Sequence, residues 1–280
     1  MRTRAGLIPI VAAAILAVVS ISVLPSVNMQ SRQSNKGNEN GEKGSDDSLS
    51  QVTPNSEDNC SGPAVRLPST KLFIEHNSTD EDTGVHGLFD GLNWVNLRIV
   101  DPRGRLILEV EPNGQLRTQS ISGIFFESAE PPNEDVPIEE IFRRFPEGRY
   151  QVEGCTKDGK RMKGSALFTH DIPAGPVITF PQDGGVVSAS NLTITWNHVT
   201  TTLDGRPLRR TGYEVIVTKD VPDDPNGFSL PVFDVHVLPS VTSLTVPTQF
   251  LEPNTAYELE VLALEFSGNQ TITVLHFETR

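Results

Sequence analysis

The sequence has 280 residues and a formal net charge of −13, with frequent Pro and Gly and few Trp and Met residues. A chain of this length can form two domains of ordinary size together with accessory segments. The negative charge argues against nucleic acid or an anionic membrane surface as a partner, because phosphate groups are bound by clustered Lys and Arg. Acidic residues spread along a chain are typical of a solvated surface, and specific cation binding is the alternative.

Residues 1–26 have the pattern of an export signal. Arg2 and Arg4 precede a long apolar run, which places the N-terminus on the cytoplasmic side of a membrane. Ser20 and Ser22 are small residues at a spacing that suits cleavage, whereas the length of the run also suits an uncleaved membrane anchor. Either alternative predicts an extracytoplasmic protein, periplasmic or secreted, with the membrane as a partner only through this segment if it is uncleaved.

Residues 27–59 are polar, with too few apolar side chains to bury a core, so we expect a disordered linker there. Cys60 and Cys155 are the two cysteines of the chain. In an oxidising compartment such a pair more often forms one disulfide than remains as two free thiols, which is the alternative. Closing about 95 residues would stabilise the fold by roughly 4–5 kcal/mol in the loop-entropy description.

Residues 60–172 alternate apolar and polar side chains in short runs, which predicts an immunoglobulin-like β-sandwich with one short helix. The expected strands cover residues 71–75, 94–101, 105–111, 124–126 and 150–154. The helix is expected over 137–145, with Asp135 as its cap and Pro137 in its first turn. Tyr150 follows Pro146 and Gly148 in a pattern that resembles a tyrosine corner.

A polar segment between the first two of these strands is the one local cluster that could bind a metal. Asp80, Asp82 and Asp90 offer the hard oxygen ligands that calcium prefers, although the spacing is not that of an EF-hand. His76 and His86 could instead help to bind a transition metal. The alternative is a solvated polar loop that connects two strands.

Residues 173–280 begin with a stiff Pro-rich linker and continue with turn-separated strands. Seven strands are expected, over 177–180, 192–196, 212–218, 232–237, 243–246, 256–264 and 271–278. Trp196 ends the second strand and Tyr213 opens the third, so both are expected to be structural. This architecture makes the whole folded part all-β, with two tandem β-sandwiches.

Tyr257 marks the centre of the second domain. Leu251 and Pro253 precede it in the pattern of a tyrosine corner, in which the phenol hydrogen-bonds to the backbone a few residues upstream. Leu259 and Val261 fall on the same side of the strand as Tyr257, whereas Glu258 and Glu260 fall on the other side.

Residues 173–280 resemble a fibronectin type III domain through Trp196, the Tyr213-Glu-Val-Ile-Val217 strand and Leu251-x-Pro253-x-Thr255-x-Tyr257. The resemblance implies a spacer or binding module without enzymatic activity. Residues 125–131 and 169–176 resemble a group of exported bacterial proteins of uncharacterised function with the same two-domain layout, which implies export and supplies no activity.

Arg206, Arg209 and Arg210 form a small basic island in an acidic domain, which predicts either an anion or partner contact or a solvated loop. The sequence has no G-x-S-x-G, H-E-x-x-H, G-x-x-x-x-G-K-[ST] or G-x-G-x-x-G motif. Glu139 and Glu140 are adjacent on the expected helix and make a poor acid–base pair.

We therefore expect a non-catalytic exported protein that uses no cofactor and acts as a binding or spacer module for a protein or glycan of the cell envelope. One alternative is a calcium-dependent structural or adhesion protein that uses the 76–90 loop. The other is an enzyme with a site at the domain junction, because a fold by itself never excludes catalysis.

Overall fold

A computed structural model describes residues 60–220 and 231–280, and β-strands make up most of this part. The all-β prediction is therefore confirmed. The predicted signal over 1–26 and the predicted linker over 27–59 lie outside the described residues. Within the described ranges, no helix combines the length and the apolar character needed to cross a membrane.

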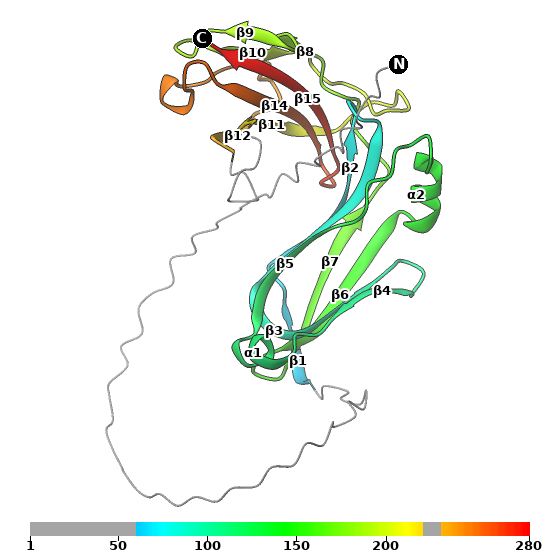
Figure 1. Ribbon diagram of the computed structural model, residues 1–280. Helices are drawn as coiled ribbons and strands as arrows, with labels where there is room; N and C mark the ends of the chain where they lie inside the picture. The colour runs from blue at the N-terminus through cyan, green and yellow to red at the C-terminus, as the bar shows by residue number, and fades with distance from the viewer. Residues whose placement is uncertain (1–59, 221–230) are drawn as a thin grey trace, which may run out of the picture. The chain divides into compact units, whose positions relative to one another are not determined.

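The first half of the fold is one strongly folded sheet (Figure 1). Its strands are β1 (Ser61–Arg66), β2 (Ser69–Asn77), β3 (Asp82–Val100), β4 (Leu106–Val110), β5 (Ile121–Glu127), β6 (Gly148–Thr156) and β7 (Lys160–Phe168). They follow the order β1-β7-β6-β3-β2, and β4 and β5 also pair with β3.

Strand β3 organises this half because it is 19 residues long and belongs to two layers. Its beginning pairs with β2 and β5, and its end pairs with β4 and β6. The sheet folds back so that Thr70 Oγ1 on β2 donates a hydrogen bond to the carbonyl of Ser165 on β7, at 2.9 Å. The core between the layers includes the fully buried side chains of Trp94, Tyr150 and Phe168.

Most of the segment expected to be a polar loop belongs to the beginning of β3. The chain reverses over residues 78–81, and the strand starts at Asp82. Val85 and Phe89 are buried on one face, but Asp82 and His86 on the other face mask the alternation that a strand usually shows in a sequence. The loop is therefore a tight turn, and Glu81 in it adopts a φ of 55°.

The described part contains two short α-helices, α1 (Gly114–Gln119) and α2 (Ile138–Arg144), of which the sequence predicted only the second. Helix α1 has no buried residue, so it lacks the apolar periodicity that reveals a helix. The expected cap of α2 was wrong, because Pro137 rather than Asp135 occupies the N-cap and no side chain caps the helix. Ile141 anchors α2 in the core of the first half.

The second half contains two facing sheets with a core between them. Its strands are β8 (Ile178–Phe180), β9 (Gly185–Val187), β10 (Thr193–Trp196), β11 (Arg210–Lys219), β12 (Phe233–Val237), β13 (Ser243–Thr245), β14 (Ala256–Glu265) and β15 (Gln270–Thr279), with the short 3₁₀ helix η1 (Thr248–Phe250). The seven predicted strands are present, and β9 is an additional one that pairs with β15. Strands β13, β10 and β8 form the smaller sheet.

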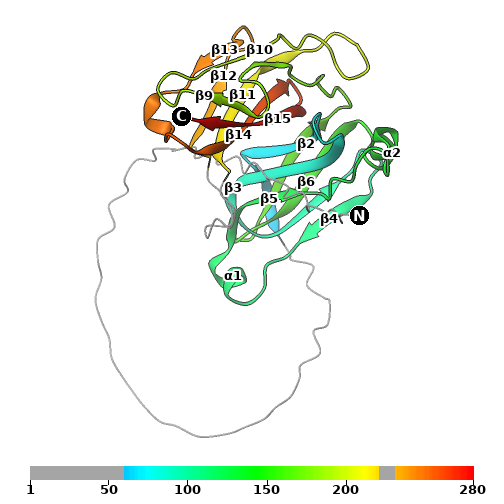
Figure 2. The same cartoon turned by 45° about the horizontal axis from the view of Figure 1, so that its top comes forward.

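The two halves share a sheet, because β2 and β15 pair in parallel over three residue pairs, from Glu75 with Gln270 to Asn77 with Ile272. Figure 2 shows the same two strands from a second direction. The described residues belong to one compact unit with two hydrophobic cores. The sequence predicts a stiff linker between the tandem sandwiches, and the pairing of β2 with β15 adds a second connection between them. The domain boundary at 172 and 173 stays a prediction.

Asn269 fastens this junction. Its side chain is fully buried, its Oδ1 accepts a hydrogen bond from the backbone N–H of Ile74 at 2.8 Å, and its Nδ2 donates to the carbonyl of Thr169 at 2.9 Å. Ser78 adds a hydroxyl bond to the carbonyl of Ile272 at 2.9 Å. Side chains that are far apart in the sequence therefore hold β2 and β15 in register.

Candidate functional site

The structure does not assemble the predicted calcium ligands into one site. Asp82 lies opposite Asn77 at one end of the β2–β3 pairing, and Asp90 lies opposite Ser69 at the other end. Eight residues of extended chain separate them by roughly 26 Å, at about 3.3 Å per residue. Asp90 therefore cannot share a coordination sphere with Asp80 and Asp82, and the three-residue ligand set is corrected to two neighbouring carboxylates.

Asp80 and Asp82 remain at the β2–β3 turn. Asp80 is exposed and accepts a hydrogen bond from Asn77 Nδ2 at 3.0 Å. Burial raises the pKa of Asp82 to about 6, with the negative charges of Glu130 and Asp80 adding to the effect. The raised pKa shows that few positive charges lie near the Asp82 carboxyl group.

The two histidines of this segment have separate environments. His76 is buried, and its Nδ1 lies 3.0 Å from both the carbonyl of Asp82 and Oγ1 of Thr83. Burial lowers its pKa, which favours the neutral ring. His76 is therefore a structural residue that stabilises the turn, and it does not face His86.

His86 lies between two carboxylates that the sequence analysis did not single out. Its Nε2 is 2.9 Å from Oε1 of Glu130, and its Nδ1 is 3.9 Å from Oε2 of Glu75. These three residues form one of two groups in the described part whose ligand atoms lie within 4.8 Å of one another. Gly84 provides the space, because a Cβ there would come within 2.6 Å of Cγ of Glu130.

The Glu75–His86–Glu130 group is an internally satisfied ion cluster. Burial lowers the pKa of His86, but the hydrogen bond that its ring donates to Glu130 and the charge of Glu75 outweigh the burial and leave the pKa raised. Glu75 also accepts a hydrogen bond from Gln270 on β15, so the cluster helps to join the halves. Phe73 and Phe125 enclose the imidazole with ring centroids 5.4 and 5.7 Å away.

The second group is Glu214, Asp234 and His236, on β11 and β12. Glu214 lies directly opposite His236, and Ile216 lies opposite Asp234. Glu214 is buried, whereas Asp234 and His236 are exposed on β12, the last strand of the sheet. This group joins a buried carboxylate to two accessible ligands.

Glu260 on β14 lies on the same face of the sheet as Glu214 and is 3% exposed. Burial raises the pKa of Glu260 to about 9, and the neighbouring Glu258 adds to the shift. Its carboxyl group is therefore protonated at neutral pH. The sequence predicts that Glu258 and Glu260 lie on the face of the strand that points away from the core. Ile216 and Leu262 are buried on that same face, so both faces of these strands are covered.

A signal for this second buried face was present in the sequence. Ile216 and Leu262 are apolar on the face that should have been solvated, and apolar residues on both sides of a strand are typical of burial on both faces. The group Glu214, Asp234 and His236 itself had no signal, because its members are brought together only by the pairing of β11 with β12.

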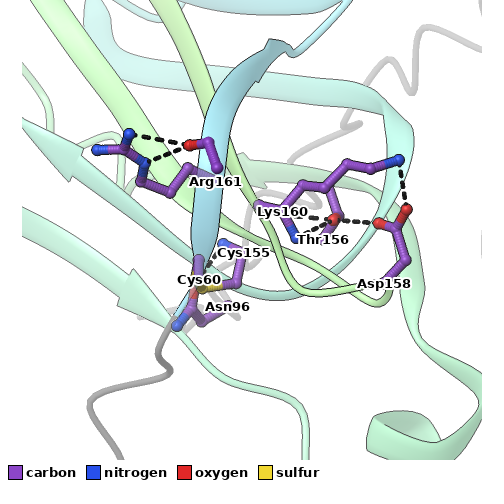
Figure 3. The surroundings of a disulfide bond; sticks show 8 residues. Cys60, Asn96, Cys155, Thr156, Asp158, Lys160 and Arg161 are labelled. Carbon is purple, nitrogen blue, oxygen red and sulfur yellow. Dashed lines mark hydrogen bonds and ion pairs between the residues drawn. A yellow bond between two sulfur atoms is a disulfide. The ribbon is translucent and has the colours of Figure 1, made fainter.

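The predicted disulfide is present between Cys60 and Cys155, whose Cα atoms are 5.7 Å apart (Figure 3). It joins the residue before β1 to β6. Around it, Asn96 Oδ1 accepts a hydrogen bond from the N–H of Cys155 at 2.7 Å, and Arg161 donates two hydrogen bonds to the carbonyl of Gly62. The disulfide and these bonds fasten the start of the described chain to the first half.

The expected structural aromatic residues are all buried. Tyr257 Oη accepts a hydrogen bond from the N–H of Glu252 at 2.8 Å, and Tyr150 Oη donates to the carbonyl of Pro146 at 3.1 Å, so both corners form. Tyr213 Oη accepts from the N–H of Val199 at 2.8 Å. Trp196 packs edge-on against Tyr213, with centroids 5.4 Å apart.

The three arginines of the basic island make contacts within the chain. Arg206 pairs with Asp171 at 2.5 Å and with Asp204 at 2.7 Å. Arg209 lies over the ring of Phe266, 3.4 Å from its centroid. Arg210 donates to the carbonyls of Val199 and Pro239. These side chains connect loops. An anion or partner contact and a solvated loop both remain predictions for this basic island.

The fold and the two cores define an all-β protein of the β-sandwich class. No protein-family model matches the chain, and no curated protein matches it. Solved structures similar to it include the third fibronectin III domain of human KIAA0343 protein, at 19% identity and a TM-score of 0.30, covering 40% of this chain and 86% of that one.

A myokine structure is similar at 20% identity and a TM-score of 0.27, covering 38% of this chain and 97% of that one. A computer-based redesign of a β-sandwich protein is similar at 21% identity and a TM-score of 0.26, covering 40% of this chain and 98% of that one. These similarities concern the fold and leave the activity of the chain open.

Proposed function

We propose that this chain is a non-catalytic exported protein that holds a protein or glycan of the cell envelope on a rigid β-sandwich scaffold. In this proposal residues 173–280 act as a fibronectin type III-like module and residues 60–172 as an immunoglobulin-like one. The observation that carries it is the parallel pairing of β2 with β15, since a shared sheet keeps the two halves at a fixed geometry.

Two further features support the proposal. The disulfide between Cys60 and Cys155 suits an oxidising compartment outside the cytoplasm. Asn269 occupies the junction of the halves with both ends of its side-chain amide hydrogen-bonded, so this junction is built as a fixed joint. A rigid joint suits a spacer or a binding scaffold better than a site that must close around a substrate.

The calcium-dependent alternative loses the ligand set on which it was based, because Asp90 lies at the far end of the β2–β3 pairing from Asp82. Asp80 and Asp82 alone supply fewer oxygens than the six to eight, roughly, that calcium prefers. The separation of Asp90 from Asp82 is therefore an argument for the scaffold proposal over the calcium-dependent one.

The test is a binding and turnover experiment with the purified full-length chain. The chain is incubated with purified envelope glycan and, separately, with envelope protein, and is then sedimented with each. We expect saturable co-sedimentation with one of them and recovery of the bound material with unchanged mass. Release of shortened or modified fragments would contradict the proposal, and so would the absence of binding to both fractions.

A further inference from the structure

Strands β11 and β12 bring three potential metal ligands to one face of the sheet. Glu214 lies directly opposite His236, and Asp234 is two residues from His236 on the same side of β12. Directly opposite side chains on an antiparallel pair have Cβ atoms about 4.5–5.5 Å apart. One ligand atom from each of the three residues lies within 4.8 Å of the other two.

Glu214 is the unusual member of this group. Its side chain is 1% exposed, and both carboxylate oxygens are buried without an accepted hydrogen bond from any residue in the described ranges. Nε2 of His236 lies 3.3 Å from Oε1 and is the nearest cationic or donor group that the structure places beside it. A buried carboxyl group whose oxygens accept no hydrogen bond is costly, and a bound cation would compensate it.

We propose that Glu214, Asp234 and His236 bind a divalent transition-metal ion of the zinc class. The imidazole together with two carboxylates favours zinc over calcium or magnesium, which prefer oxygen ligands alone. Three protein ligands leave a fourth position for water or for a group of a partner molecule. The inference goes beyond the proposed function, because a scaffold can bind its partner with or without a metal.

The surroundings suit a cation that arrives from solvent. Asp234 and His236 lie on an edge strand, and the His236 side chain is 53% exposed. Lys71 on β2 is the basic residue whose charge acts on His236.

The Glu75–His86–Glu130 group is a poorer candidate for a metal site than the group on β11 and β12. His86 already holds Glu130 at 2.9 Å, and Gln270 donates to Glu75, so its polar atoms are partnered within the chain. A metal there would have to displace existing hydrogen bonds, whereas among described residues Glu214 would exchange only its 3.3 Å contact with Nε2 of His236.

The experiment titrates Zn²⁺ into the untagged full-length chain after removal of metals with a chelator, with calorimetry as the readout. Co²⁺ serves as a second probe, because its visible absorption reports the coordination geometry. We expect saturable Zn²⁺ binding by the wild type and more than about tenfold weaker binding by His236→Ala, since loss of an outer-shell partner alone costs 10–100-fold. Asp234→Asn should weaken binding in the same direction.

His276→Ala is the matched control. His276 is also on the shared sheet, its side chain is 55% exposed, and its Nε2 lies 3.4 Å from a carboxylate oxygen of Glu258. It should bind Zn²⁺ as tightly as the wild type. No binding of Zn²⁺ or Co²⁺ by the wild type would overturn the proposal. Equal affinity of His236→Ala and wild type, or equal losses in His236→Ala and His276→Ala, would overturn it as well.

Discussion

At the scale of single residues, the unusual feature of this protein is the burial of carboxyl groups on the sheet face opposite the second core. Glu214 and Glu260 are both below 5% exposed, and burial keeps Glu260 protonated at neutral pH. A group whose folded-state pKa lies above its unfolded value stabilises the fold only while it stays protonated. Glu260 is therefore a source of pH-dependent stability.

We expect Glu260→Gln to reduce the loss of stability at alkaline pH. The pKa rises from 4.5 to about 9 on folding, so the contribution is complete below pH 4.5 and is lost as the pH rises toward 9. Linkage gives about 1.4 kcal/mol for each pH unit within this window. The wild type should thus lose roughly 3 kcal/mol more than the variant between pH 6.5 and 8.5.

Urea unfolding at these two pH values measures the difference. Glu278→Gln is the control, because Glu278 is exposed on the neighbouring strand β15. It should keep the pH dependence of the wild type. Parallel stability curves for the wild type and Glu260→Gln would show that Glu260 is ionised in the folded protein.

At the scale of elements, the junction of β2 and β15 is stabilised by side-chain hydrogen bonds in addition to its three paired residues. Asn269 accepts from the N–H of Ile74 on one side and donates to the carbonyl of Thr169 on the other. Each buried group that loses its partner costs roughly 1–3 kcal/mol. The side chain of one residue therefore stabilises the junction through both ends of its amide.

We expect Asn269→Ala to lower the free energy of unfolding by roughly 2–4 kcal/mol, because it leaves the buried N–H of Ile74 and the partly buried carbonyl of Thr169 without this partner. Chemical denaturation measures the loss, and hydrogen exchange at the amide of Ile74 should become faster. Asn191→Ala is the control, since Asn191 is exposed and precedes β10. Equal stability of the two variants would contradict the assigned role of Asn269.

At the scale of the whole molecule, the disulfide and the shared sheet act on the same compact unit. Cys60 and Cys155 close a loop with a sequence separation of 95 residues. The sheet then extends the first half into the second through β15. Each core contains one tryptophan, Trp94 in the first and Trp196 in the second, so the unfolding of each half can be followed separately.

We expect a single unfolding transition in the oxidised protein, reported equally by the Trp94→Phe and Trp196→Phe variants through the tryptophan that remains. Reduction should cost about 4–5 kcal/mol by loop entropy and should act first on the half reported by Trp94. Fluorescence-detected unfolding with and without reductant measures both effects, and Cys60→Ser/Cys155→Ser should reproduce the reduced form. Separate transitions in the oxidised protein would contradict a fixed joint.

Much of the fold could be predicted because it depends on local chemistry. The alternation around Tyr257 predicted the strand, its buried face and the corner bond to Glu252, all of which are present. The pairing of Cys60 with Cys155 followed from the presence of two cysteines in a chain with an export pattern. These features need only the period of a strand, the geometry of a turn and the redox chemistry of a thiol.

The candidate sites could not be predicted to the same extent. The polar segment around Asp82 predicts either a cation site or a solvated loop, because its charged residues hide a strand whose other face is buried. The sequence gives no sign that Glu75 and Glu130 lie beside His86, because they meet it only through the pairing of β3 with β2 and β5.

The sequence by itself therefore determined the all-β class, the corners, the disulfide pair and most strand positions. Only the tertiary structure decided that β2 joins β15, that Glu260 is buried, and that Glu214 meets Asp234 and His236. The physical reason is that alternation shows which side chains share a face of one strand, whereas the neighbour across the sheet and the cover over each face depend on pairings between distant segments.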